Sequence, residues 1–162
     1  MNSALASSEM EISSPPYGFL AYLTRSKAED PEDPSNSVVF YDPEDGEVFR
    51  KIPGDAEGRA EMLKRWNRIA RENIADKIKY IGILYEPEIA DEEYDNSLPQ
   101  DADGWKQLCR DVLTASRESM GRRRYEVFAA VIHNGQYRPE YGGYRPLHIH
   151  VLMQSVKKDK DN

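Results

Sequence analysis

Hydrophobic residues recur at helical spacing in two segments of the chain, near residues 55–74 and 102–120. In each segment the apolar side chains fall three or four positions apart with charged residues between them, which is typical of a helix that packs one face on a core. A shorter helix is predicted to begin directly after Pro15 and Pro16, because proline is well tolerated in the first turn of a helix. The pattern therefore predicts three helices.

Five further segments have the pattern of β-strands. Two runs rich in β-branched and aromatic residues flank a DPEDG turn between residues 37 and 52, which predicts a hairpin with Gly46 at a positive φ. The segments 77–87 and 126–133 are predicted strands, the second almost entirely apolar and therefore central in its sheet. Alternation at 146–154 places His148, His150, Leu152 and Gln154 on one strand face. We predict an α+β fold, a two-layer sandwich whose mostly antiparallel sheet has its helices on one face.

The length of 162 residues fits one domain, which we predict over residues 17–156. The Ser-rich residues 1–16 are predicted to be a disordered segment and residues 157–162 a charged tail. No apolar run is long enough to span a membrane, and the N-terminus lacks the pattern of a secretory signal. A single cysteine, Cys109, excludes a disulfide framework, so we expect a reducing, cytoplasmic location.

The net charge of −7 is unlike that of a dedicated nucleic-acid-binding domain, which is usually basic. The charge is uneven, however, and two groups of basic residues stand out. These are Lys64, Arg65, Arg68 and Arg71 on one predicted helix, and residues 122–124 after the other. Two interpretations stay open at this point: a local basic groove within an acidic protein, or two solvated helix ends.

All three histidines of the chain, His133, His148 and His150, fall within a short C-terminal window. Two histidines at positions i and i+2 of a strand point the same way, with β carbons about 6–7 Å apart, which suits two ligands of one metal ion. If the two strands pair antiparallel, His133 reaches the same place. Three neutral imidazoles with open coordination positions are typical of a catalytic metal site. The alternative is that each histidine is an ordinary core or surface residue.

The HIH sequence at 148–150 resembles the signature of HUH endonucleases, which nick single-stranded DNA in replication, transposition and conjugation. Other segments resemble the mobilisation relaxases of the VirD type, in the same order along residues 17–154. LAYLTRSK at 20–27 is similar to the tyrosine motif, and IKYIGILYEP and FAAVIH are similar to two strands of that family. No tyrosine follows His150, so a tyrosine nucleophile must lie upstream, as it does in relaxases. The chain departs from the family in its spacing, because His148 follows His133 by fifteen positions, where about five are usual.

The resemblance implies an HUH-like fold and metal-dependent nicking and rejoining of single-stranded DNA at an origin-like site, with accessory mobilisation or replication proteins as partners. Tyr22 would be the nucleophile and would stay linked to the 5′-phosphate, and the three histidines would bind the divalent metal. Mg or Mn is implied, although imidazole ligands also suit Zn, Ni or Co. Gln154 stands where the family has an asparagine, in a supporting position, and Arg25 would contact phosphate. A tyrosine nucleophile also needs a neighbouring cation or base that helps remove its proton.

The segment between the last two predicted strands is rich in tyrosine, glycine and arginine. Tyr144, Arg138 and Arg145, with two further tyrosines, are candidates for stacking bases and contacting phosphates. The alternative is a loop that packs on the surface of its own domain, just as Tyr22 is alternatively a surface residue of an amphipathic helix. Two other functions stay open: a DNA-binding or metal-binding relative that does not nick, and a three-histidine metal hydrolase that acts on a small substrate.

Overall fold

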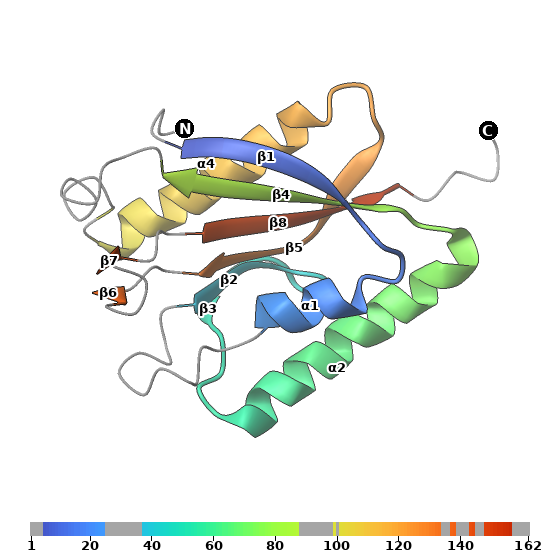
Figure 1. Ribbon diagram of the computed structural model, residues 1–162, viewed down its shortest axis with the longest axis horizontal. Helices are drawn as coiled ribbons and strands as arrows, with labels where there is room; N and C mark the ends of the chain where they lie inside the picture. Colours follow the sequence, from blue (N-terminus) through green and yellow to red (C-terminus); the bar gives the residue numbers. More distant parts are fainter. Residues whose placement is uncertain are drawn as a thin grey trace.

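The computed structural model describes residues 5–24, 37–87, 99, 101–133, 137–138, 143–144 and 148–156. Figure 1 shows a twisted sheet with helices packed against it. The described strands are β1 (Leu5–Ile12), β2 (Ser37–Asp42), β3 (Gly46–Lys51), β4 (Tyr80–Pro87), β5 (Tyr125–His133), β6 (Tyr137–Arg138), β7 (Gly143–Tyr144) and β8 (His148–Ser155). The described helices are α1 (Tyr17–Thr24), α2 (Ala56–Glu72) and α4 (Ala102–Ser119), with a short 3-10 helix, η1, at Asn73–Asp76.

Six strands form one sheet in the order β1-β4-β8-β5-β2-β3, and every neighbouring pair is antiparallel. The apolar strand β5 lies between β8 and β2, which confirms its predicted central position. Strands β2 and β3 form the predicted hairpin, and Gly46 has a φ of +74°. The predicted α+β class and antiparallel sheet are confirmed.

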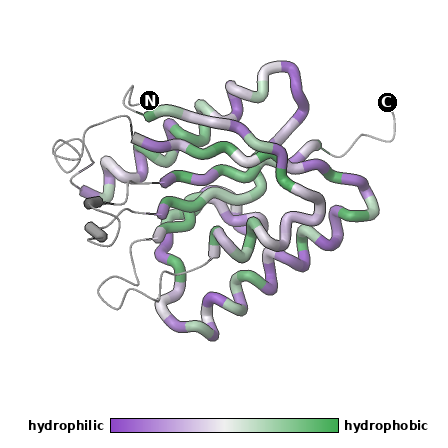
Figure 2. The backbone as a smooth tube through the Cα atoms, viewed as in Figure 1, coloured by the Kyte–Doolittle hydropathy of each residue, from purple (hydrophilic) through white to green (hydrophobic). Residues whose placement is uncertain are grey.

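The two long helices begin at caps that the sequence supplies. The Asp55 carboxylate accepts a hydrogen bond from the Gly58 N–H before α2, and Asp101 does the same for Gly104 before α4. Helix α4 ends just before Gly121, which has a φ of +59°, a conformation that favours glycine at the end of a helix. Figure 2 shows hydrophilic and hydrophobic residues alternating along α2, as expected for a helix with one buried face.

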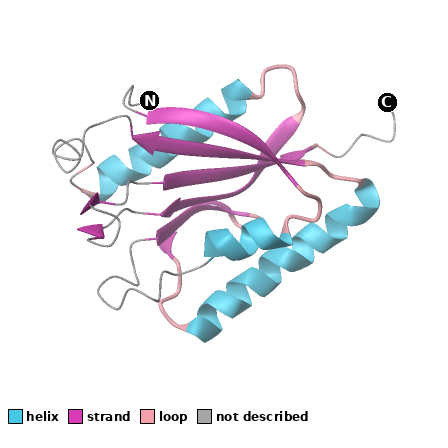
Figure 3. Ribbon diagram, viewed as in Figure 1, coloured by secondary structure: helices cyan, strands magenta, loops and turns pink. Residues whose placement is uncertain are grey.

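The helices cover both faces of the sheet, and the prediction that they pack on one face was wrong. Leu113 and other residues of α4 pack with Ile149 and Val151 of β8 in one hydrophobic cluster. Leu20 of α1 and Trp66 of α2 pack with Leu152, on the opposite face of the same strand, in a second cluster. Figure 1 and Figure 3 show the same arrangement, with α4 on one side of the sheet and α1 and α2 on the other. The physical reason is that the central strands are apolar on both faces.

The N-terminal segment is also different from the prediction of disorder over residues 1–16. Residues 5–12 form β1, which pairs with β4 along its whole length at one edge of the sheet. The strand is largely exposed, and Met10 retains 60% of its surface. Backbone pairing with β4 holds β1 in place, and Leu5 and Ile12 at its two ends pack against the hydrophobic clusters. The domain therefore begins before residue 17, and the predicted tail at 157–162 lies outside the described residues.

Within the described ranges, no helix has the length and apolar character needed to cross a membrane.

Candidate functional site

The two central strands bring the three histidines to one face of the sheet. Strands β5 and β8 pair antiparallel, with His133 opposite His148 and Val131 opposite His150. Because directly opposed residues of an antiparallel pair share a face, all three imidazoles lie on the side covered by α1 and α2. His133 and His150 are nearly buried, with exposed fractions of 5% and 6%. His148 and His150 thus share a strand face, and His133 lies beside them, as predicted.

Helix α1 places Tyr22 against these histidines. The helix begins with a hydrogen bond from the Leu20 N–H to the Pro16 carbonyl, and it buries Leu20 and Leu23 completely in the core. Its half-buried residues Phe19 and Tyr22, three positions apart on one side of the helix, then face the sheet. The ring centroid of Tyr22 lies 5.2 Å from that of His150 and 5.4 Å from that of His133. The structure thus brings together the proposed nucleophile and two proposed metal ligands.

The rings of this histidine–tyrosine cluster (Tyr22, His133, His148 and His150) contact one another mostly edge to face. The His133 and His150 centroids are 5.0 Å apart, at an interplanar angle of 63°. Tyr22 meets His150 at 90°, whereas His148 and His150 are nearly parallel, 6.2 Å apart. Phe19 adds a further edge contact to His150 at 6.0 Å. His150 is therefore the central ring of the cluster.

His133 and His148 each have a polar group close to one ring nitrogen. Nε2 of His133 lies 3.1 Å from the carbonyl oxygen of Leu23, and because a carbonyl only accepts, this nitrogen carries the hydrogen. Nε2 of His148 lies 3.8 Å from a carboxylate oxygen of Glu86 on β4. Histidines that bind metals usually have a carbonyl or carboxylate at the nitrogen that does not bind the ion. In a neutral His133, Nδ1 is then the nitrogen with the lone pair that a metal needs.

The histidines fit a divalent metal in residue type, strand register and outer hydrogen bonding. Within the described part of the chain, however, no three His, Cys, Asp or Glu side chains converge as ligands in the conformation seen. The rings of His148 and His150 are nearly parallel, with centroids 6.2 Å apart, and those of His133 and His150 are 5.0 Å apart at 63°. An ion bound by these residues would require the imidazoles to turn.

The lone cysteine does not contribute to this site. Cys109 lies on α4, in the hydrophobic cluster on the opposite face of the sheet. Burial raises the pKa of its thiol to about 12, so the group stays protonated at neutral pH and is a poor metal ligand or nucleophile.

The remaining predicted site residues lie elsewhere or outside the described residues. Gln154 is on the histidine face of β8, but four residues beyond His150, or about 13 Å along the strand. Its amide accepts a hydrogen bond from Asn73 and donates one to Glu126, so it joins η1 to the sheet and does not support the cluster. Arg25 and Arg145 fall outside the described residues, and for Arg138 and Tyr144 only the backbone of β6 and β7 is described.

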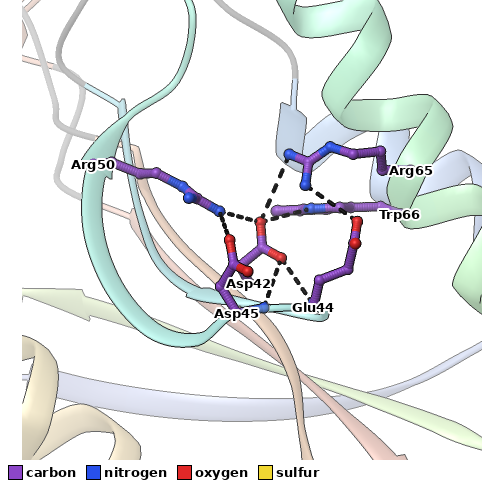
Figure 4. A network of polar contacts seen from close by, with 6 residues as sticks. All are labelled: Asp42, Glu44, Asp45, Arg50, Arg65 and Trp66. Carbon is purple, nitrogen blue, oxygen red and sulfur yellow. Dashed lines mark hydrogen bonds and ion pairs between the residues drawn. The ribbon is translucent and has the colours of Figure 1, made fainter.

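A second buried polar cluster, which was not predicted from the sequence, is shown in Figure 4. The Asp42 carboxylate, at the end of β2, is fully buried and accepts hydrogen bonds from Trp66 Nε1, from Arg50 and from two backbone N–H groups of the following turn. Arg65 of the basic group on α2 lies 3.9 Å from Asp42 and pairs with Glu44 at 3.2 Å. One of the four basic residues on α2 is thus part of this Asp42 network (Asp42, Glu44, Asp45, Arg50, Arg65 and Trp66).

Burial pushes the pKa of Asp42 upward, but the hydrogen bonds from Glu44, Asp45, Trp66 and Arg50 outweigh that effect and lower the pKa. The carboxylate is therefore ionised at neutral pH. Asp42 lies five residues from Ser37, which pairs with His133, so the network is roughly 15 Å from the histidines. It connects the β2–β3 hairpin to α2 and belongs to the structure of the fold. Its DPEDG turn gave no sign of burial, because the partners come from other segments.

Comparison with known proteins adds no family. No protein-family model matches the chain, and neither the curated proteins nor the solved structures contain a match. The fold and the site define the class: an α+β protein with a histidine–tyrosine cluster between its central strands and an N-terminal helix.

Proposed function

We propose that this protein nicks and rejoins single-stranded DNA through a covalent intermediate on Tyr22, with the help of a divalent metal ion. The observation that carries the proposal is the packing of Tyr22 directly on His133 and His150. Nucleophile and metal ligands must reach the same phosphate, and here they come from three separate elements to one place. Relaxase-like chemistry uses this combination of side chains, and the resemblance of the motifs supports the same interpretation.

In the proposed reaction, the phenolic oxygen of Tyr22 attacks the scissile phosphorus. The phenol gives up its proton to water as a bond between this oxygen and phosphorus forms. The bond from phosphorus to the 3′ oxygen breaks, and the 3′ oxygen takes up a proton from water and leaves as a hydroxyl. His133, His148 and His150 would hold the metal, which stabilises the extra negative charge on the phosphate oxygens. The phosphotyrosine ester conserves the bond energy of the diester, so a 3′ hydroxyl can reverse the step.

Two of the three histidines have an outer partner that would suit this scheme. The Leu23 carbonyl fixes the orientation of His133, and Leu23 follows the proposed nucleophile directly in the chain. A movement of α1 would therefore shift both Tyr22 and the partner of His133. Glu86 occupies the corresponding position beside His148. Such outer partners orient ligands and increase their basicity.

The substrate would be a single strand at an origin-like site in the cytoplasm, with accessory mobilisation or replication proteins as partners. The proposed contacts to its phosphates and bases are Arg25, Arg138, Arg145 and Tyr144. The metal would be Mg or Mn, with Zn, Ni or Co as further candidates on the ligand chemistry.

The test is a covalent adduct. The protein is incubated with Mn²⁺ and a long circular single-stranded DNA, which offers many sequences, and the mixture is denatured before electrophoresis. We expect a protein–DNA adduct that survives denaturant, disappears with a chelator and is absent in Tyr22→Phe. Tyr17→Phe is the matched control, because Tyr17 is a half-buried tyrosine of the same helix. An equal adduct yield in Tyr22→Phe would contradict the proposal.

A further inference from the structure

A pocket of about 350 Å³ opens between α1 and the β1–β4 edge of the sheet, directly beside the histidine–tyrosine cluster. Tyr22 and His150 line it on one side, together with Phe19 of the same helix as Tyr22, and residues 8–10 of β1 and 82–84 of β4 complete the described lining. The volume is in the range of small-ligand sites in proteins. The pocket is therefore continuous with the candidate catalytic site and is built in part by β1.

The lining favours a flat, apolar group. Met10 keeps 60% of its surface exposed although it faces this pocket, and thioethers make favourable contacts with ring systems. Gly82 also lines the pocket, where a β carbon would lie 3.3 Å from the Ile12 side chain and 3.5 Å from the Phe19 ring. A glycine at this position keeps the space beside Phe19 open.

The charges around the pocket favour the neutral part of a nucleotide. Among the described residues that line it, Glu9 is the one acidic or basic side chain besides His150, and both of its carboxylate oxygens are held by Arg123, at 2.8 and 3.1 Å. The described lining offers no cation to a phosphate. A phosphate would therefore be placed at the histidines, and the adjacent base would occupy the pocket.

We infer that this pocket holds an unpaired nucleobase of the nucleotide next to the scissile phosphate, stacked against Phe19 and covered by Met10. The inference rests on the proposed function, since it takes the strand at Tyr22 as its substrate. Stacking of a base on an aromatic residue is sequence-tolerant, and its loss lowers affinity about 5- to 150-fold. The pocket would position the strand so that the phosphate lies at Tyr22.

The test compares binding of two labelled single strands of about a dozen nucleotides, oligo-dT and an abasic strand with the same backbone, by fluorescence anisotropy. We expect the wild-type protein to prefer the base-bearing strand. Ser8→Ile adds bulk to the pocket from an exposed edge position, and it should reduce this preference about fivefold or more. Ser7→Ile is the matched control, because the neighbouring side chain points to the other face of β1.

Met10→Ala provides a second variant, since an exposed residue can be truncated without disturbing the core, and it should reduce the preference in the same direction. Thermal melts confirm that the variants are folded. Equal preference in Ser8→Ile, Ser7→Ile and wild type would overturn the inference, as would a wild-type protein that forms the adduct yet binds both strands equally. A preference that Ser8→Ile removes, in a protein that forms no adduct, would support the pocket and overturn the nicking. Absence of any DNA binding would overturn both.

Discussion

Two buried polar clusters contact the helices on the same side of the sheet, and they are built differently. In the Asp42 network, an ionised carboxylate is surrounded by arginines, an indole N–H and backbone N–H groups of the fold itself. In the histidine–tyrosine cluster, four rings pack mostly edge to face beside a pocket of about 350 Å³. The first arrangement satisfies a charge internally, whereas the second presents polar rings next to a space that a ligand can enter.

This contrast indicates that the two clusters serve different purposes. A buried charge with a complete set of donors stabilises one conformation, and removing it leaves those donors without an acceptor. A cluster of ionisable rings at a pocket, by contrast, is an arrangement typical of functional sites. We therefore expect variants of the two clusters to separate stability from activity.

The largest effect is expected at the centre of the histidine–tyrosine cluster. His150→Asn keeps a polar side chain in place but removes a metal ligand, and it should lower adduct formation by roughly 10²- to 10³-fold. Its melting temperature should change much less than that of the Asp42 variant described next. Gln154→Ala, on the same face of the same strand, is the control and should leave adduct formation unchanged. A large loss of adduct formation in Gln154→Ala would contradict this contrast between the two clusters, because the site would then extend along β8.

The next effect concerns stability. Asp42→Ala should lower the free energy of unfolding by about 2–3 kcal/mol, since Trp66 and two backbone N–H groups lose a charged acceptor. For a chain of this length the melting temperature should fall by about 5–10 °C. Asp45→Asn changes an exposed partner of the same arginine and should cost less than about 1 kcal/mol. Equal losses in the two variants, measured by denaturant titration, would show that burial of Asp42 is unimportant.

The smallest effect is a dependence of stability on pH. The pKa of Asp42 is lower in the folded protein than the value near 4 of an unfolded chain. Its contribution is therefore complete at pH values above about 4 and is lost as the pH falls through the lower, folded pKa. Between neutral pH and pH 2 or so, the free energy of unfolding should decrease more steeply in the wild type than in Asp42→Asn. If the free energy of unfolding fell equally with pH in the wild type and in Asp42→Asn, the expectation would be wrong, and the acid sensitivity would belong to other carboxylates.

The segments with strong periodicity were predicted correctly from the sequence. The stripe around Trp66 and the apolar run of β5 determine their elements almost alone, because burial of these side chains dominates the local energetics. The prediction that His148 and His150 lie on the same face followed from strand geometry alone. It did not require knowledge of the residues around them.

The features that depend on distant contacts were missed. Strand β1 has a Ser- and Glu-rich sequence that alternates only over Glu9–Ile12, and it pairs as a strand because β4 offers it a free edge. The sequence DPEDG is typical of an exposed turn, and it does not indicate that Trp66 and Arg50 donate hydrogen bonds to Asp42. The apolar character of β5 on both faces was a usable sign that helices would cover both sides of the sheet.

The central claim, that Tyr22 is the nucleophile of the histidine–tyrosine cluster, is tested most directly by identifying the residue that carries the DNA. The adduct formed with Mn²⁺ and single-stranded DNA would be digested with nuclease and protease, and the modified peptide sequenced by mass spectrometry. We expect a nucleotide linked through its 5′-phosphate to Tyr22. A nucleotide on any other residue, or no modified peptide from a protein that cleaves the strand, would contradict it.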